Sequence, residues 1–319
     1  MKNYMNLLYV AASMLLTCGC EESPIQPEYP AAEPVTKVGK ALVENTDMVA
    51  SIYKDSSYVL TPGLTVTEFF YLGSHGKTMK TWFFEVDLTQ EKLTIENVTP
   101  YDKPIGTGGS ATLTQMALCV DSPENVVWGG TNTDFGSSIT GAQGIFHHDG
   151  VCGRDEFTEQ PVRPRSFFYL TKDKKAFTAE ASEYTGIASS VDIEEAFSGS
   201  SQVLRGGSVP FIEENDLSDI HPRTAVGCSK DGKTVWFMVV DGRRYTWSNG
   251  MYLEELGEVF KALGADSAIN LDGGGSSTFI VRTVPGHDDP DRFKVLNWPN
   301  DNGGQERLLY NGMVIVTKE

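Results

Sequence analysis

Polar and hydrophobic residues alternate along much of the chain, and this alternation predicts β-strands. Residues 65–71, 81–88 and 92–98 alternate with a period of two and are rich in β-branched and aromatic side chains, which pack well on a pleated sheet. The connections between these stretches are short. We therefore expect antiparallel strands that follow one another along the chain.

Two more pairs of apolar stretches predict β-hairpins. One pair, residues 167–170 and 176–179, flanks a charged turn, and the other flanks Asp231-Gly232, a dipeptide typical of hairpin turns. Residues 227–234 of the second hairpin also fit the pattern G-x-x-x-x-G-K-[ST] of a phosphate-binding loop. That loop needs a helix directly after it, whereas residues 234–240 have the pattern of a strand. We therefore exclude nucleotide hydrolysis.

Helical periodicity is confined to two segments. Residues 252–263 repeat apolar side chains every three or four positions, and Gly264 follows where a left-handed helix cap is expected. Residues 112–120 form a weaker candidate. Many antiparallel strands with two or three helices predict an α+β fold with mostly antiparallel sheets.

The chain begins with a segment that is typical of a bacterial lipoprotein signal peptide. Residues 5–16 form an apolar run behind Lys2, too short to span a bilayer as a mature helix. The run ends at residues 17–20 (Thr-Cys-Gly-Cys), and a cysteine directly after such a run suggests lipidation. Gly19 favours Cys20 as the lipidated residue. The alternative is an ordinary signal peptide whose cysteines are incidental.

The remaining chain divides into a tether and a folded part. Residues 21–35 are rich in proline and predict an extended tether after the signal peptide at residues 1–20. Residues 36–61 form an N-terminal extension, and the domain that carries the motifs described below spans residues 62–319. This arrangement predicts a lipid anchor in the bacterial cell envelope, at the outer membrane and on its periplasmic or surface face.

Composition narrows the function classes. Lys and Arg number 26 against 43 Asp and Glu, which gives a net charge of −17. A cationic surface is required to displace counterions from nucleic-acid phosphates, so general nucleic-acid binding is excluded. Cys119, Cys152 and Cys228 remain after the leader, match no zinc-site spacing and are expected to be small buried residues. The sequence gives no indication of the oligomeric state.

The most informative segment is residues 268–279, in which a strand ends in Asp272 and three glycines and two serines follow. Successive glycines permit dihedral angles that other residues avoid, and they let a ligand approach backbone N–H groups closely. Asp272 with this turn predicts a site that holds an anion or sugar hydroxyls beside an acid. The alternative is a tight turn or bulge in which the Asp caps backbone amides.

A second strand end, residues 129–136, delivers another carboxylate, Asp134, into a loop. Asp134 and Asp272 form a candidate pair for acid/base or nucleophilic chemistry at a glycosidic carbon. Arg223 and Arg243 lie at the two ends of the second predicted hairpin. These arginines are either surface ion-pair partners or the local positive charge that an acidic protein needs to bind an anionic substrate.

These residues resemble the phosphodiester glycosidase family. Five segments occur in the family's order, and the string Asn-Leu-Asp-Gly-Gly-Gly-Ser-Ser at residues 270–277 is specific. The similarity runs from residue 62 to residue 316. The five segments are residues 131–135, 222–227, 240–243 and 270–277, and Glu306-Arg307 with Asn311.

The resemblance implies an α+β catalytic domain at residues 62–319. It would hydrolyse a sugar-1-phosphodiester, of the N-acetylglucosamine-1-phosphodiester type, at the anomeric carbon, on an envelope or extracellular glycan. Asp272 or Asp134 would be the base or nucleophile, and Arg223 the phosphate clamp; the chemistry requires no cofactor or metal. The residues expected to bind substrate are Asn132, Thr131, His221, Asp241, Arg243, Gly273, Gly274, Gly275, Ser276 and Asn311.

Two other functions stay open at this point. A glycan-binding surface lipoprotein would keep the pocket without turnover, and its sugars would stack on aromatic side chains such as Trp128, Trp247 and Trp298. A phosphodiesterase would cut the P–O bond instead. Such enzymes usually need paired metals held by several His and Asp residues, and the five histidines of this chain form no recognisable metal-binding motif.

Overall fold

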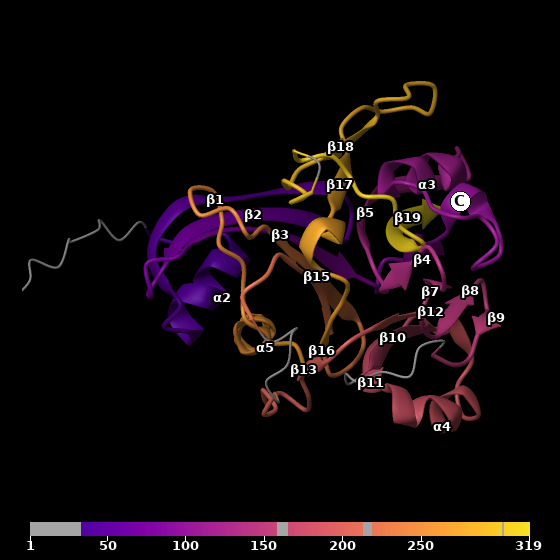
Figure 1. Ribbon diagram of the computed structural model, residues 1–319, viewed down its shortest axis with the longest axis horizontal. Helices are drawn as coiled ribbons and strands as arrows, with labels where there is room; N and C mark the ends of the chain where they lie inside the picture. The colour runs from indigo at the N-terminus through magenta and orange to yellow at the C-terminus, as the bar shows by residue number, and fades with distance from the viewer. Residues whose placement is uncertain (1–32, 158–164, 213–218, 302) are drawn as a thin grey trace, which may run out of the picture. The chain divides into compact units, whose positions relative to one another are not determined.

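The computed structural model describes residues 33–157, 165–212, 219–301 and 303–319 (Figure 1). The predicted signal peptide, Cys20 and the tether up to residue 32 lie outside the described residues. Strands dominate the described part, and their pairings are antiparallel. The predicted α+β class is confirmed. Among the described residues, no helix is long and apolar enough to cross a membrane.

The largest sheet has seven strands in the order β1-β2-β3-β15-β14-β16-β13. The predicted hairpin of β14 and β15 is confirmed, and Gly232 in its turn has φ +72°. A strand follows this turn, so the phosphate-loop pattern there is incidental, as expected. The strands are β1 (Val49–Thr61), β2 (Leu64–Gly73), β3 (Thr78–Asp87), β13 (Gln202–Leu204), β14 (Arg223–Cys228), β15 (Thr234–Val240) and β16 (Ser267–Asn270).

Residues 36–61 supply the edge strand of this sheet and a helix that packs against it. They form helix α2 (Lys37–Asn45), whose N-terminus is capped by the Thr36 hydroxyl, and β1, which pairs with β2 along most of its length. Residue 62, where the predicted domain begins, therefore lies in the turn of a hairpin.

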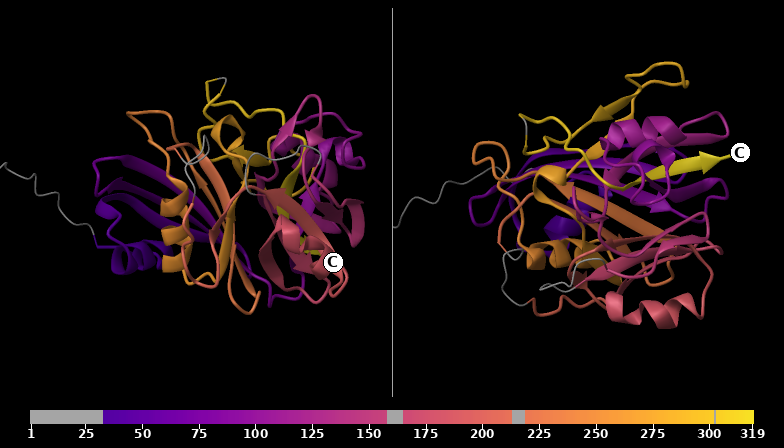
Figure 2. Two further views of the ribbon diagram at one scale, coloured as in Figure 1. Left: turned by 60° about the horizontal axis from the view of Figure 1, so that its bottom comes forward. Right: turned by 45° about the vertical axis from the view of Figure 1, so that its right-hand side comes forward.

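Two five-stranded sheets follow, and Figure 2 shows them from two further directions. The second sheet has the order β11-β10-β12-β8-β9, and the third has the order β18-β17-β5-β19-β4. The strands of the second sheet are β8 (Phe146–His148), β9 (Val151–Arg154), β10 (Ser166–Thr171), β11 (Ala176–Glu180) and β12 (Ile193–Gly199). The strands of the third sheet are β4 (Leu93–Val98), β5 (Asn125–Asn132), β17 (Phe279–Arg282), β18 (Phe293–Val295) and β19 (Gly312–Lys318). A small hairpin of β6 (Gly136–Ser137) and β7 (Gly141–Ala142) follows β5.

Helices α3 (Leu113–Val120) and α5 (Leu253–Ala262) confirm the two predicted helical segments. The described residues also contain α2 and α4 (Tyr184–Ala188), so the expected two or three helices become four. Periodicity could not reveal α4, because five residues are too few to show it. Helices α2 and α5 pack on the large sheet, and α3 packs on the third sheet.

The three cysteines of the described chain are free. Cys228 is buried in β14, as expected. The expectation is wrong for Cys119 and Cys152, which are exposed. Cys119 lies near the end of α3, and Cys152 lies on β9, an edge strand of the second sheet.

The predicted site residues lie where the chain passes from the large sheet to the third sheet. Strand β16 ends at Asn270 in the large sheet, and β17 starts at Phe279 in the third. Phe84 of the large sheet stacks on Phe279, with ring centroids 3.9 Å apart. This packing holds the start of β17, where the glycine-rich connection that carries Asp272 ends.

Candidate active site

The glycine-rich connection is held against two neighbouring segments by its backbone. The N–H of Asp272 donates to the carbonyl of Thr133 at 2.9 Å, and the N–H of Gly274 donates to the carbonyl of Pro222 at 2.9 Å. Gly274 has φ +63°, and a Cβ at Gly273 would lie 2.6 Å from the carbonyl oxygen of Pro222. Gly273 and Gly274 are therefore required by this tight turn, and the turn brings Asp272 beside the start of β14.

A cavity of about 290 Å³ opens at this turn. Seven of the residues predicted for the site line it, and they come from the ends of β14, β15 and β16. Four further residues complete the lining. The predicted residues are His221, Arg223, Arg243, Asp272, Gly273, Gly274 and Gly275, and the further ones are Phe135, Pro222, Asn270 and Arg307.

Asp272 is the one carboxylate among the described residues that line this cavity. Burial raises its pKa to about 6, and the negative charge of Asp134 acts in the same direction. The Ser276 hydroxyl, the positive charge of Arg307 and the N–H of Gly273 oppose the rise. A carboxylate with a pKa near 6 is ionised at neutral pH and still basic enough to accept a proton.

Three arginines, Arg223, Arg243 and Arg307, line the same cavity as Asp272. Arg223 is only 2% exposed, and its Nε donates to the carbonyl of Met251 at 3.0 Å. Burial, with the nearby charge of Arg243, lowers the pKa of Arg223 to about 10, so this guanidinium stays charged at neutral pH. Arg243 lies 3.3 Å from the ring of His221, measured from Nη2 to Nδ1. In a chain of net charge −17, this local excess of cations indicates a site for an anion.

Arg307 also lines the cavity, although its sequence position predicted no role for it. Its Nη1 donates to the Ser276 hydroxyl at 3.2 Å, and its Nη2 pairs with Asp301. Ser276 does not line the cavity itself and is buried behind the turn. Its hydroxyl therefore connects Arg307 to the catalytic candidate Asp272.

Asp134 was the other candidate for the base or nucleophile, and the structure places it outside the lining of the cavity. Its side chain is 1% exposed. The carboxylate accepts hydrogen bonds from Arg165 Nη2 at 2.6 Å and from the backbone N–H groups of Phe135, Gln143 and Gly144 at 2.7–2.9 Å. Burial raises the pKa of Asp134, and these four donors oppose the rise. Asp134 therefore organises the loop that presents Phe135 to the cavity.

Asn132 also lies behind the cavity instead of lining it. Its Nδ2 donates to the carbonyl of Asp272 at 2.6 Å, and its Oδ1 accepts from the Thr224 hydroxyl and the Thr278 N–H. These bonds tie β5, β14 and the glycine-rich turn together. Asn132 thus positions Asp272 through the backbone.

Asp241, Thr131 and Asn311 are likewise buried and do not line the cavity. Burial raises the pKa of Asp241 to about 6, and its carboxylate accepts from Trp247 Nε1 at 2.7 Å and from the Trp298 N–H at 2.8 Å. Asp241 is thus an anchor for the segment after β18. Thr131 Oγ1 and Asn311 Oδ1 lack a hydrogen-bond partner among the described residues. Thr131 lies in β5, and Asn311 directly precedes β19, the strand paired with β5.

Two of the three tryptophans predicted as possible sugar platforms, Trp247 and Trp298, have a cation over the ring. Lys80 Nζ lies 3.0 Å from the ring centre of Trp247, and the guanidinium of Arg244 lies 4.4 Å from that of Trp298. Trp128 donates from Nε1 to the hydroxyl of Thr317. A sugar that stacks on Trp247 or Trp298 from these sides would have to displace a positive charge.

Among the described residues, one set of side chains comes close enough together to share a metal ion, and it lies outside this cavity. The set is Glu96, His148 and Asp149. Burial by itself lowers the pKa of His148, but the carboxylates of Glu195, Asp149 and Glu96 outweigh it and raise that pKa to about 9. The protonated imidazole forms ion pairs with Asp149 and Glu195, and a metal ion would have to displace its proton.

The sequence and the fold of this chain are both similar to those of known proteins. Residues 125–316, more than half of the chain, match the family model described as phosphodiester glycosidase. A stretch of 130 residues is 30% identical to N-acetylglucosamine-1-phosphodiester alpha-N-acetylglucosaminidase of Bos taurus. That match covers 36% of this chain and spans 24%, about a quarter, of the length of the curated relative.

Solved structures share the fold. The catalytic domain of zebrafish N-acetylglucosamine-1-phosphodiester alpha-N-acetylglucosaminidase, auto-inhibited by its pro-peptide, aligns with a TM-score of 0.58 and 17% identity over 94% of this chain and 99% of that one. A hypothetical protein from Synechocystis aligns with a TM-score of 0.54 and 11% identity, over 84% of this chain and 65% of the other. With the match of its sequence over residues 125–316, the chain belongs to the phosphodiester glycosidase family.

Proposed function

We propose that the chain hydrolyses the bond between the anomeric carbon and the phosphate oxygen of a sugar-1-phosphodiester, of the N-acetylglucosamine-1-phosphodiester type. The observation that carries the proposal is the cavity in which Asp272 shares one lining with Arg223, Arg243 and Arg307. The name of the Bos taurus relative describes the same bond type and supports the choice of substrate. The biological substrate would be an envelope or extracellular glycan.

The reaction suits a site with a single carboxylate. The group that leaves the anomeric carbon is a phosphate monoester, which departs with the bonding electrons on its oxygen and needs little protonation. Water attacks the anomeric carbon as the C1–O bond breaks, and its proton passes to Asp272. Positive charge develops on the sugar ring beside the carboxylate, and the arginines stabilise the negative charge on the phosphate.

The proposal is tested with N-acetylglucosamine-1-phosphate methyl diester and the purified chain, with the products followed by phosphorus NMR. Free sugar and methyl phosphate would show cleavage at the anomeric carbon. Sugar 1-phosphate and methanol would mean that the P–O bond is cut, and the proposal would be wrong. If the diester binds without any turnover, the site is a glycan-binding site.

The role of the arginines as a phosphate clamp predicts a specific loss. We expect Arg243→Met to lower kcat/KM for the diester by about tenfold to a hundredfold, because one charged donor to the phosphate is removed. Arg244→Met is the matched control, since Arg244 stacks on Trp298 and does not line the cavity. The measurement is steady-state kinetics on both variants. Equal losses of kcat/KM in the two variants would contradict a phosphate clamp at Arg243.

The pKa of Asp272 predicts a pH dependence. A general base must be ionised, so kcat/KM should be constant at neutral pH and fall about tenfold per pH unit below the pKa of about 6. Arg223 does not titrate in this range, because its pKa of about 10 keeps it charged. The measurement is kcat/KM from pH 4.5 to 8. A flat profile across pH 6 would contradict the assignment of Asp272 as the base.

We also propose that the protein is held in the bacterial cell envelope by a lipid on Cys20. The support is the sequence pattern alone, since Cys20 lies outside the described residues. Cys20→Ala should release the protein from the membrane fraction, and Cys18→Ala should not. The check is fractionation of cells that express each variant, followed by mass spectrometry of the N-terminal peptide. An unmodified Cys20 in the native protein would contradict the anchor.

A further inference from the structure

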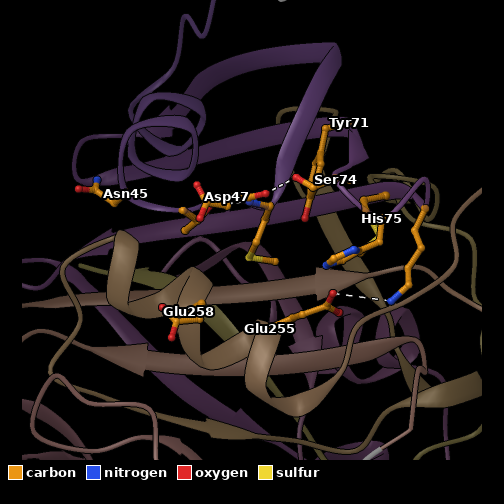
Figure 3. A pocket seen from close by; sticks show the side chains of 12 residues that line it. Asn45, Asp47, Tyr71, Ser74, His75, Glu255 and Glu258 are labelled. Carbon is orange, nitrogen blue, oxygen red and sulfur yellow. Dashed lines mark hydrogen bonds and ion pairs between the residues drawn. The ribbon is translucent and has the colours of Figure 1, made fainter. Parts of the chain in front are cut away.

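A second cavity, of about 350 Å³, lies between α5 and the outer strands of the large sheet (Figure 3). Its walls come from the turn after α2, the end of β2, the β2–β3 turn and one side of α5. Among the described residues, none lines both this cavity and the active-site cavity. Its size is that of pockets that hold small molecules.

The walls of this cavity are fixed by hydrogen bonds. The N–H of Ser74 donates to the carbonyl of Met48 at 3.0 Å, and the Ser74 hydroxyl donates to the carbonyl of Asp47. Figure 3 shows the second of these bonds at the upper wall. The turn after α2 is thus tied to the β2–β3 turn, and the cavity exists before any ligand arrives.

A buried hydroxyl in this cavity lacks a partner. Tyr71 lines the cavity and is 1% exposed, and its hydroxyl makes no hydrogen bond to any described residue. Figure 3 shows its side chain running from β2 along the wall. A buried polar group without a partner costs free energy. Burial and then the charge of Glu255 raise the pKa of Tyr71 far above its ordinary value, so the group stays a neutral hydroxyl.

Glu255 supplies a carboxylate oxygen to the same space. Its Oε2 accepts from the N–H of Tyr252 at 2.8 Å, whereas its Oε1 is 3.8 Å from Lys77 Nζ, too far for a hydrogen bond. Lys77 is also held over the ring of Tyr252, 4.4 Å from its centre. Asp47 and Glu258 add two further negative charges to the lining. The lining thus carries three carboxylates against the ammonium of Lys77 and the imidazole of His75, and Glu255 Oε1, in an ion pair with Lys77 at 3.8 Å, can still accept a hydrogen bond.

The geometry points to an organic cation. We infer that this cavity binds a small primary ammonium compound with an apolar body, whose N–H groups donate to Glu255 Oε1 and to the Tyr71 hydroxyl oxygen. Met48 and Met79 supply an apolar lining for the body. A bare metal ion fits less well, because among the described residues the side chains that approach metal-sharing distance are those near His148.

The test is isothermal titration of the purified chain with 2-phenylethylammonium chloride, and with 2-phenylethanol as the uncharged analogue. We expect the amine to bind and the alcohol to bind at least about tenfold more weakly, because hydrogen bonds to a charged group are the stronger ones. Glu255→Gln should weaken the binding of the amine by about tenfold. This variant keeps an acceptor for the Tyr252 N–H, so the start of α5 stays capped.

Two further variants complete the test. Tyr71→Phe should weaken amine binding several-fold, and Glu254→Gln, on an exposed neighbour outside the lining, should leave it unchanged. Asp272→Asn should also leave it unchanged, which separates this cavity from the active site. Absence of amine binding, equal binding of amine and alcohol, or undiminished binding in both Tyr71→Phe and Glu255→Gln would each overturn the inference.

Discussion

Replacing Asp272 by Asn is expected to lower kcat by about a hundredfold to ten-thousandfold, the range that a positioned general base contributes. The substitution keeps the size of the side chain and removes its ability to take a proton from water. Binding should survive, because the arginines and the glycine-rich turn remain. The expected result is thus a large fall in kcat with KM little changed, measured by the release of sugar from the methyl diester.

The control for this variant is Asp288→Asn, on an exposed loop away from the cavity, which should keep the kcat of the parent. A fall in activity that is accompanied by loss of the folded state would not count as catalytic, so the thermal unfolding of both variants is measured as well. If Asp272→Asn turned over the diester at the parental rate, another group would have to be the base. The single-carboxylate mechanism would then be wrong.

The strands were predictable because their signal is local. The alternation over residues 65–71 and the apolar run over residues 234–240 depend on neighbours in the sequence, and β2 and β15 follow from them. The order of the sheet was not predictable, since β3 pairs with β15, about 150 residues later. That pairing depends on packing between distant segments, which a single sequence does not display.

The candidate site was predictable only as a set of residues. Asp272, Arg223 and Arg243 were expected there, and the structure brings them to one cavity. Arg307 received no role because its reach to Ser276 depends on the fold of the chain between them. The sequence could not separate buried anchors such as Asp241 from residues that face substrate, since both follow strands and both carry carboxylates.

Asp134 and Asp272 illustrate the same difficulty. Each follows a strand and precedes glycine-containing segments, so the sequence left both as candidate bases. What distinguishes them is the partner of the carboxylate. Arg165, 31 residues from Asp134, holds it at 2.6 Å, whereas Asp272 faces the cavity. Asp134 is held by four donors and does not line the cavity, so it is not placed to take a proton from a water molecule there.

Replacing Asp134 by Asn is therefore expected to damage stability more than chemistry. It leaves the guanidinium of Arg165, whose side chain is 8% exposed, without a counter-charge. Breaking a buried ion pair by removing one partner costs about 3–5 kcal/mol of unfolding free energy. The measurement is urea denaturation followed by circular dichroism. Glu180→Gln, which breaks an exposed pair with Arg205, should cost less than about 1 kcal/mol.

The double variant Asp134→Asn with Arg165→Met shows how much of the lost stability is due to the unpaired charge of Arg165. With both charges gone, no uncompensated guanidinium remains, so part of the lost unfolding free energy should return. The pair of aspartates then gives opposite results: Asp272→Asn loses turnover and keeps stability, and Asp134→Asn loses stability first. If Asp134→Asn kept its unfolding free energy and lost turnover instead, Asp134 would be the catalytic acid or base. The anchoring role derived from its four donors would then be wrong.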